Sequence, residues 1–231
     1  MEFTYYGHAC FSVKMGGKHI LFDPFITGNP LAGDVDIDSI PADYIFVSHG
    51  HQDHLLDLNA IALRTGARIV SNYEIITWLS KQGITGGHGM NHGGKHAFEF
   101  GLVKYVNAVH SSSFPDGTYA GNPGGFVLSG AEGTFYYSGD TALTMDMQLI
   151  PEFFSLDFAV LPVGDNLTMG YEEALRAAQL VKTKRVIGVH YDTFEAIRLD
   201  KDKAREYFQK AGRELLLPQI GETISLEGEK K

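Results

Sequence analysis

The chain opens with short apolar runs broken by glycine. Runs at residues 3–6, 9–13 and 19–22 predict three strands, and the Gly16-Gly17 pair predicts a hairpin turn between the last two. The continuously apolar run at 44–48 predicts a strand buried on both faces. The residues at 55–63 and 73–81 have helical spacing and predict two helices, and those at 67–71 predict a strand between them.

The second half repeats this order. After a stretch at 83–95 made mostly of Gly, His, Asn and Thr, which predicts a loop, strands are expected within 97–109, broken near Gly101, and at 125–129 and 134–138. Further helices are predicted at 142–153, 171–181 and 201–211, and further strands at 158–162, 185–190 and 222–226. Each half therefore passes from antiparallel strands to strand-helix alternation. This order predicts an α/β fold, an αββα sandwich of two mixed β-sheets flanked by helices.

Composition narrows the class of protein. The 231 residues are 44 % hydrophobic and 20 % charged, which excludes a disordered chain. With no Pro-rich linker or break in composition, residues 1–231 are predicted to form one domain. The net charge of −9, without a basic stripe, argues against a nucleic-acid partner. The lone Cys10 excludes an intramolecular disulfide and a thiolate zinc cage, and is interpreted as a packed strand residue.

Two absences bear on location. No apolar run approaches the roughly 20 residues that span a bilayer, so no membrane is expected as a partner. The first residues lack the basic-then-apolar pattern of a secretory signal. A cytoplasmic location is therefore predicted.

The strongest chemical signal lies directly after the predicted strand at 44–48. The six residues His49-Gly50-His51-Gln52-Asp53-His54 spell H-x-H-x-D-H. Two histidines two positions apart in extended backbone project to the same side and can meet one ion. Asp53 and His54 begin the turn into the next helix and point differently, which suits a second ion. A solvated polar loop is the alternative, but three His and one Asp in six residues favour a metal site, since His is the commonest metal ligand.

On these residues the chain resembles the metallo-β-lactamase superfamily. The superfamily order of H-x-H-x-D-H, a lone histidine, an aspartate and a last histidine is matched by His110, by Asp140 in Ser138-Gly139-Asp140-Thr141, and by His190. Gly7-His8-Ala9-Cys10-Phe11 and Leu21-Phe22-Asp23-Pro24 resemble the ascorbate-phosphate lactonase-like branch. The segment at 162–170 resembles a small hydrolase family within that branch.

The resemblance implies two metal sites. His49, His51 and His110 would hold one divalent ion, and Asp53, His54 and His190 the other, with Asp140 bridging. Zinc is expected first, with manganese, iron or nickel as alternatives. Two ions sharing a water create a hydroxide nucleophile near neutral pH, with Asp53 and His54 as the catalytic residues.

Other polar residues have two interpretations each. Asp23 would accept the far N–H of a ligand histidine and fix its tautomer. His8 is either near the mouth of the site or a strand histidine bonded to backbone. Asp165 and Asn166 either touch substrate or cap the next helix. The glycines around His88, His92 and His96 argue against a helix of ligands there and favour a mobile loop at the site entrance.

The sequence thus predicts a metal-dependent hydrolase that cleaves an ester, lactone or phosphodiester bond of a small-molecule substrate. An iron-dependent oxidoreductase on the same fold is the first alternative, and nucleic-acid processing and a non-catalytic binding protein are the others. A homo-oligomer is expected. The sequence does not name the substrate, because loops choose the molecule while fold and metal set the reaction.

Overall fold

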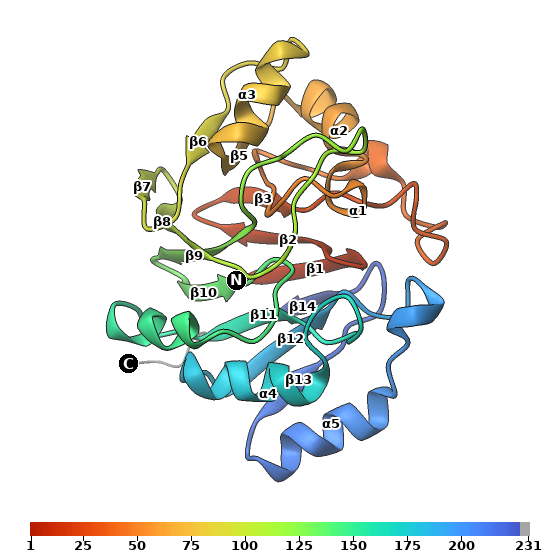
Figure 1. The fold of residues 1–231 in the computed structure, drawn as a ribbon, viewed down its shortest axis with the longest axis vertical. Coiled ribbons are helices and arrows are strands. Elements are labelled where there is room, and N and C mark those ends of the chain that lie inside the picture. Colours follow the sequence, from red (N-terminus) through yellow and green to blue (C-terminus); the bar gives the residue numbers. More distant parts are fainter. Residues whose placement is uncertain (227–231) are drawn as a thin grey trace.

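The computed structural model describes residues 1–226 as two seven-stranded sheets (Figure 1). The first sheet contains, in spatial order, β14 (Thr223–Ser225), β1 (Glu2–Gly7), β2 (Cys10–Met15), β3 (Lys18–Phe22), β4 (Tyr44–Phe46), β5 (Arg68–Asn72) and β6 (His88–Met90). The second contains β13 (Glu214–Leu216), β12 (Arg185–Val189), β11 (Phe158–Pro162), β10 (Gly133–Tyr137), β9 (Gly124–Gly130), β8 (Gly101–Asn107) and β7 (Lys95–Phe98).

Both sheets are mixed. In the first sheet β14, β1, β2 and β3 pair antiparallel, and β3 to β6 pair parallel. In the second, β7 to β10 pair antiparallel and β10 to β13 pair parallel. The carboxyl ends of the parallel strands meet at one edge of each sheet, which prepares a platform for side chains from distant parts of the chain.

Helices cover the two outer faces. Figure 1 shows α2 (Leu58–Thr65) and α3 (Tyr73–Lys81) beyond the first sheet, and α4 (Tyr171–Leu180) and α5 (Lys201–Lys210) beyond the second. The short elements are η1 (Ile37–Ser39), α1 (Gln52–Leu55), η2 (Met145–Glu152) and η3 (Glu195–Ile197). The predicted αββα sandwich is therefore confirmed. None of the helices formed by residues 1–226 is long and apolar enough to cross a membrane.

Aromatic side chains fill the space between the sheets. The Phe11 and Phe22 rings stack with centroids 4.6 Å apart, and Tyr137 of the facing sheet meets both edge-on. All three side chains are fully buried. Such edge-to-face contacts stabilise a core beyond the burial of area alone. Cys10 is also fully buried, as expected for a packed strand residue.

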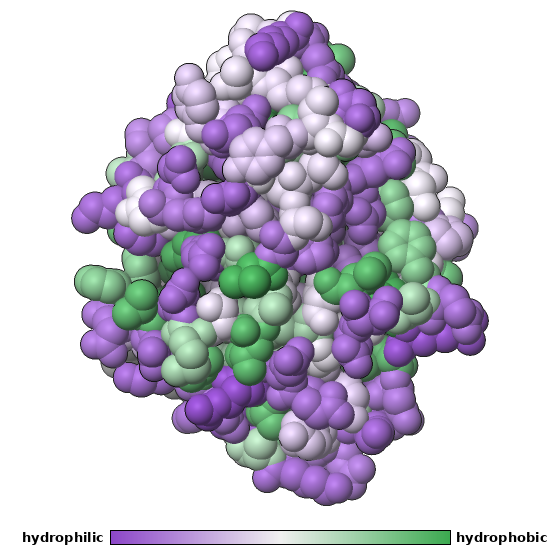
Figure 2. All heavy atoms as spheres, viewed as in Figure 1, coloured by the Kyte–Doolittle hydropathy of each residue, from purple (hydrophilic) through white to green (hydrophobic). Residues whose placement is uncertain are grey.

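The outer surface is mostly polar. Figure 2 shows hydrophilic residues over most of one face and apolar residues collected across its middle. Several large apolar side chains are exposed in residues 1–226, among them Val109, Leu149, Phe153, Leu167 and Phe194.

Three predicted elements differ from the structure. The expected helix at 142–153 is a 3₁₀ helix over Met145–Glu152, because Pro151 has no N–H to continue an α-helical ladder. The expected helix at 55–63 is two helices, α1 and α2, broken where the Asp57 carboxylate accepts the backbone N–H groups of Ile26 and Thr27. The predicted loop at 83–95 contains β6, and β6 and β13 were not predicted, since both are three-residue edge strands.

Asn72 joins α3 to the loop that follows β8. Its Oδ1 accepts the Ile75 N–H as a helix cap, and its Nδ2 donates to the carbonyl oxygen of Ala120 at 2.8 Å. We expect Asn72→Ala to lower the free energy of unfolding by about 2 kcal/mol, because a helix cap is lost and the carbonyl oxygen of Ala120 loses the nearer of its two side-chain donors. Urea denaturation measures this. Asp200→Ala, which removes the exposed cap of α5, is the matched control, with about 1 kcal/mol expected.

Candidate metal centre

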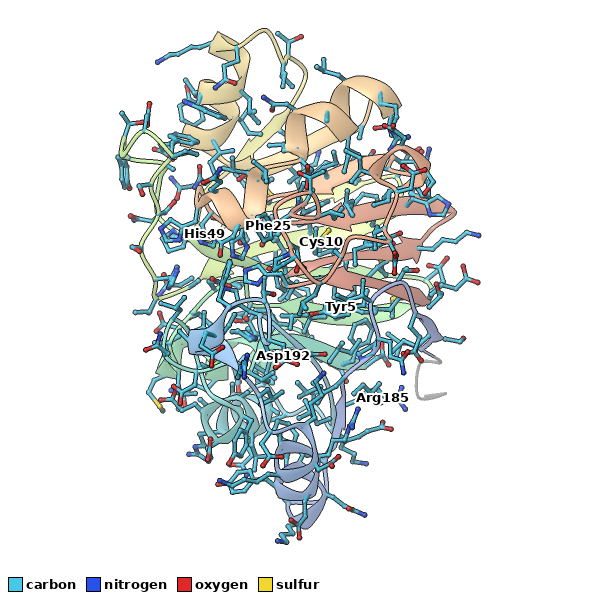
Figure 3. All side chains as sticks on the ribbon, turned by 90° about the vertical axis from the view of Figure 1, so that its right-hand side faces the viewer. Tyr5, Cys10, Phe25, His49, Arg185 and Asp192 are labelled. Carbon is cyan, nitrogen blue, oxygen red and sulfur yellow. The ribbon has the colours of Figure 1, made fainter. Side chains whose placement is uncertain are left out.

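Seven predicted ligands lie where strands of both sheets end. His49 follows β4 by three residues, His190 directly follows β12, and Asp140 follows β10. Figure 3 shows His49 and Phe25 close to one edge of the sandwich, whereas Arg185, at the start of β12, lies near the opposite side. Strand β12 therefore crosses the molecule and delivers His190 to the edge that carries His49.

A first group of ligand atoms comes from three histidines. One ring nitrogen from each of His49, His51 and His110 lies within 4.8 Å of the others. His49 Nε2 and His51 Nδ1 are 2.9 Å apart and face each other. Two imidazole nitrogens directed at one point suit a shared cation. His49 is buried, and His51 and His110 are half-buried, so this group lies toward solvent.

A second group combines Asp53, His54 and His190 with His8, again within 4.8 Å. His54 Nε2 and His190 Nε2 each lie 3.8 Å from Asp53 Oδ2. His54, His190 and His8 are buried, and Asp53 is partly exposed. His8 is therefore inside the cluster rather than at its mouth, and its side chain is bonded to Asp53 and Thr193 rather than to backbone.

Asp140 lies between the two groups. Its Oδ2 is 2.9 Å from His190 Nε2, 3.2 Å from His54 Nε2 and 3.7 Å from His110 Nε2. His110 belongs to the first group and the other two histidines to the second. One carboxylate oxygen thus faces both groups, which is the arrangement that a bridging ligand requires.

The cluster concentrates negative charge in a buried place. Burial alone would lower the pKa of His54, but the carboxylates of Asp140, Asp53 and Asp23 raise that pKa well above its ordinary value. Burial would likewise raise the pKa of Asp140, yet His190 and His54 hold it well below its usual range. Both directions have one physical meaning, namely that the pocket favours a positive charge between these side chains.

Asp23 orders the ligands from behind. Its Oδ2 accepts hydrogen bonds from His54 Nδ1 at 2.8 Å, Ser48 Oγ at 2.6 Å and the Tyr137 hydroxyl at 2.6 Å. Because the Ser48 hydroxyl hydrogen points at Asp23, Ser48 Oγ accepts from His49 Nδ1 at 3.0 Å. Both His54 and His49 therefore donate from Nδ1. This leaves Nε2 of each ring as the atom that faces the cluster, where a cation would take the place of a proton.

The backbone around the cluster allows little substitution. A Cβ on Gly50, between the two paired histidines, would lie 2.2 Å from Ala120 Cβ. Gly139 has a φ of +61° and directly precedes Asp140. His8, Asp23 and His190 adopt the same left-handed region with φ of 53°, 42° and 57°. Non-glycine residues in that region cost about 1–3 kcal/mol each and persist where the surroundings force them.

Three histidines and two other polar residues singled out in the sequence lie elsewhere. Asp165 and Asn166 are on an exposed turn, and no hydrogen bond or ion pair among the described residues joins them to the cluster. The helix-capping interpretation is wrong, because the cap of α4 is Gly170 without a side-chain bond, and contact of these two residues with substrate stays a prediction. The segment predicted as a mobile entrance loop is instead built into the sheets. His88 lies on β6 and His96 on β7, and the ring of His92 stacks on Tyr105.

Sequence reasoning missed three contributors, Ser48, Tyr137 and Thr193. Ser48 directly precedes the histidine motif, and that position is the signal that it could reach a ligand. Phe135 and Tyr137 are two positions apart in β10, so their side chains lie on the same face, in the core between the sheets. That spacing is the signal that could have placed Tyr137. Thr193 carries no sequence signal, because only the turn after β12 brings it to His8.

The donor set fits a metal ion. His54 Nε2 is buried without a hydrogen-bond partner in the described residues, although it lies 3.2 Å from Asp140. A lone buried nitrogen of this kind is costly unless something binds it. Imidazole nitrogens with carboxylate oxygens are ligands for zinc, manganese and iron alike.

Comparison with known proteins places this geometry in context. The family described as Beta-lactamase superfamily domain matches residues 2–190. UPF0173 metal-dependent hydrolases from Flavobacterium johnsoniae and Christiangramia forsetii are 51 % and 53 % identical, over 98 % of this chain and 100 % of each relative. Igni18, a metallo hydrolase from Ignicoccus hospitalis, superposes with a TM-score of 0.89 at 33 % identity, covering 99 % of both chains. An isothiocyanate hydrolase from Delia radicum gut bacteria shares the fold at 21 % identity and a TM-score of 0.80.

Proposed function

This chain belongs to the Beta-lactamase superfamily domain family and to its UPF0173 metal-dependent hydrolases, and from that premise we propose that it cleaves an ester, lactone or phosphodiester bond of a small molecule with two divalent ions. The position of Asp140 Oδ2 between the two histidine groups carries the proposal. Zinc is the proposed metal. When bound, the ions would supply an acidified water and a Lewis acid for the developing oxyanion.

The protein's own residues have distinct tasks. His49, His51 and His110 would hold one ion and Asp53, His54 and His190 the other, with Asp140 shared. Asp53 is the ligand of the buried group that reaches solvent, so its carboxylate orients the attacking water toward a substrate arriving from that side. His54 would bind the ion through Nε2, because its Nδ1–H is donated to Asp23.

The number of metal ions bound per chain is the measurement that tests the proposed function. Protein purified without a metal-affinity tag is expected to hold about two ions per chain by elemental mass spectrometry, as dinuclear hydrolases do. His51→Ala should lose metal, whereas His19→Ala, a histidine of the β2–β3 hairpin, should not. Chelator dialysis should abolish hydrolysis of p-nitrophenyl butyrate, γ-butyrolactone or bis-p-nitrophenyl phosphate, whichever is cleaved, and added zinc should restore it.

Two results would contradict the proposal. Failure to bind metal after reconstitution would leave a binding protein on this fold. Stoichiometric iron with substrate-dependent oxygen consumption, and without hydrolysis of the three probes, would assign an oxidoreductase instead.

A further inference from the structure

The carboxylate of Asp53 has an unusual setting. It lies on α1, a helix of four residues, and its side chain is 25 % exposed. The other acidic member of the cluster, Asp140, is buried among histidines that hold it. A carboxylate on so short and open an element needs a partner to keep one orientation. The described residues provide that partner in His8, whose Nε2 lies 3.0 Å from Asp53 Oδ2.

His8 is itself held from all sides. Its carbonyl oxygen accepts the Tyr5 hydroxyl at 3.0 Å and the backbone N–H of His190 at 2.7 Å. Its ring packs edge-on to Phe25 and Phe194, with centroids 5.4 and 5.5 Å away. With a φ of 53°, the backbone at position 8 is also restrained. The ring therefore presents Nε2 to Asp53 in one direction.

Thr193 completes the arrangement from the opposite side of the ring. Its Oγ1 lies 3.0 Å from His8 Nδ1. The Asp53 carboxylate can only accept, so His8 Nε2 carries a proton and donates it. The Thr193 hydroxyl has two acceptors within reach, His8 Nδ1 at 3.0 Å and the carbonyl oxygen of Tyr191 at 3.4 Å. The shorter contact favours donation to His8 Nδ1, which gives the three side chains one continuous direction of hydrogen bonding.

We propose that Thr193, His8 and Asp53 form a hydrogen-bonded chain in which His8 is a positioning residue for Asp53. The Thr193 hydroxyl donates to His8 Nδ1, and His8 Nε2–H donates to one lone pair of Asp53 Oδ2. The other lone pair is left to face His54 and His190. This chain rests on the proposed function, because its consequence is a tighter second metal site. Partners behind a metal ligand are typically worth about 10- to 100-fold in metal affinity.

The first test needs no metal. In metal-free protein with ¹⁵N-labelled histidine, long-range ¹H–¹⁵N NMR reports which nitrogen of each ring carries the proton, and the His8→Gln spectrum identifies the His8 signals. We expect His8 to be protonated on Nε2. A proton on Nδ1 would overturn the chain, because Nε2 would then be a free ligand nitrogen rather than a donor to Asp53.

The second test measures zinc retained per chain against rising chelator concentration. His8→Ala is expected to release its second ion at about tenfold lower chelator than the wild type and to keep its first. Thr193→Val, which removes only the hydroxyl, should shift the same step less. His8→Gln, whose amide retains an N–H donor, should recover part of the loss.

Matched controls separate this chain from a general loss of packing. Thr183→Val removes another buried threonine hydroxyl, bonded to the carbonyl oxygen of Arg185, and should leave zinc retention unchanged. Unchanged retention in both His8→Ala and Thr193→Val would overturn the positioning role. A wild-type protein that holds fewer than two ions would contradict the proposed function instead, and the tautomer of His8 would still decide the chain.

Discussion

Asp140→Asn should abolish most metal-dependent hydrolysis, by about a thousandfold or more, since it removes the carboxylate charge that the two proposed ion sites would share. Its Oδ2 lies within 3.7 Å of His190, His54 and His110. Asparagine keeps the shape but replaces the negative charge by a neutral amide. The loss of rate should therefore be accompanied by a loss of bound metal, measured together on the same sample.

Asp146→Asn is the matched control for that experiment. Asp146 is exposed on η2 and accepts a hydrogen bond from Asn107 Nδ2, away from the histidine groups. It should retain wild-type metal and activity. If Asp140→Asn also retained two ions per chain and its rate, Asp140 would not be a bridging ligand.

Asp23→Asn is expected to have the largest effect on stability. Three donors point at its Oδ2 and a fourth, the Ser48 backbone N–H, at its Oδ1, all buried. An amide nitrogen in place of either oxygen replaces an acceptor by a donor, which then faces the donors that Asp23 accepted. Breaking a buried charged network on one side costs about 3–5 kcal/mol, which urea denaturation of metal-free protein should reveal.

The same variant should also bind zinc more weakly, because His54 loses its acceptor and the Ser48 hydroxyl, which orients His49, loses the carboxylate that it donates to. Asp157→Asn is the comparison. Asp157 accepts a backbone N–H from Thr134 at 2.7 Å, far from the ligands in the fold, and about 1 kcal/mol is expected there. Equal stability losses in the two variants would show that Asp23 is an ordinary buried acceptor.

The parts of this structure that could be predicted from the sequence depend on local spacing. Residues 44–47 of the run at 44–48 are apolar because β4 is covered on both faces, so the histidine motif after the run had to lie at a strand end. The turns and the alternation of strands with helices likewise predict the two sheets and the helices that cover them. The pairing of Asp23 with a ligand histidine was also expected, and the structure brings Asp23 and His54 together at 2.8 Å.

The remainder depends on contacts between distant segments. Thr193 and His8 are 185 positions apart, and they meet because the His190 backbone N–H bonds the His8 carbonyl oxygen. Edge strands such as β6 are too short to show an alternation of apolar and polar residues. They form because they pair with a neighbouring strand, which the sequence does not reveal. The segment at 142–153 does contain a helix, but Pro151 makes it a 3₁₀ helix rather than an α-helix. The spacing of apolar residues alone could not distinguish these two helix types.

The division of ligands between the two halves of the chain has a consequence for folding. Asp53 and His54 follow a strand of the first sheet, whereas Asp140 and His190 follow strands of the second. An ion held by these residues would therefore act as a removable cross-link between the sheets, one that forms only after they have docked. Free zinc at a thousand times its Kd would add about 4 kcal/mol to the free energy of unfolding. Chelation should accordingly make the seam between the sheets, rather than either sheet alone, the first region to exchange its amide hydrogens.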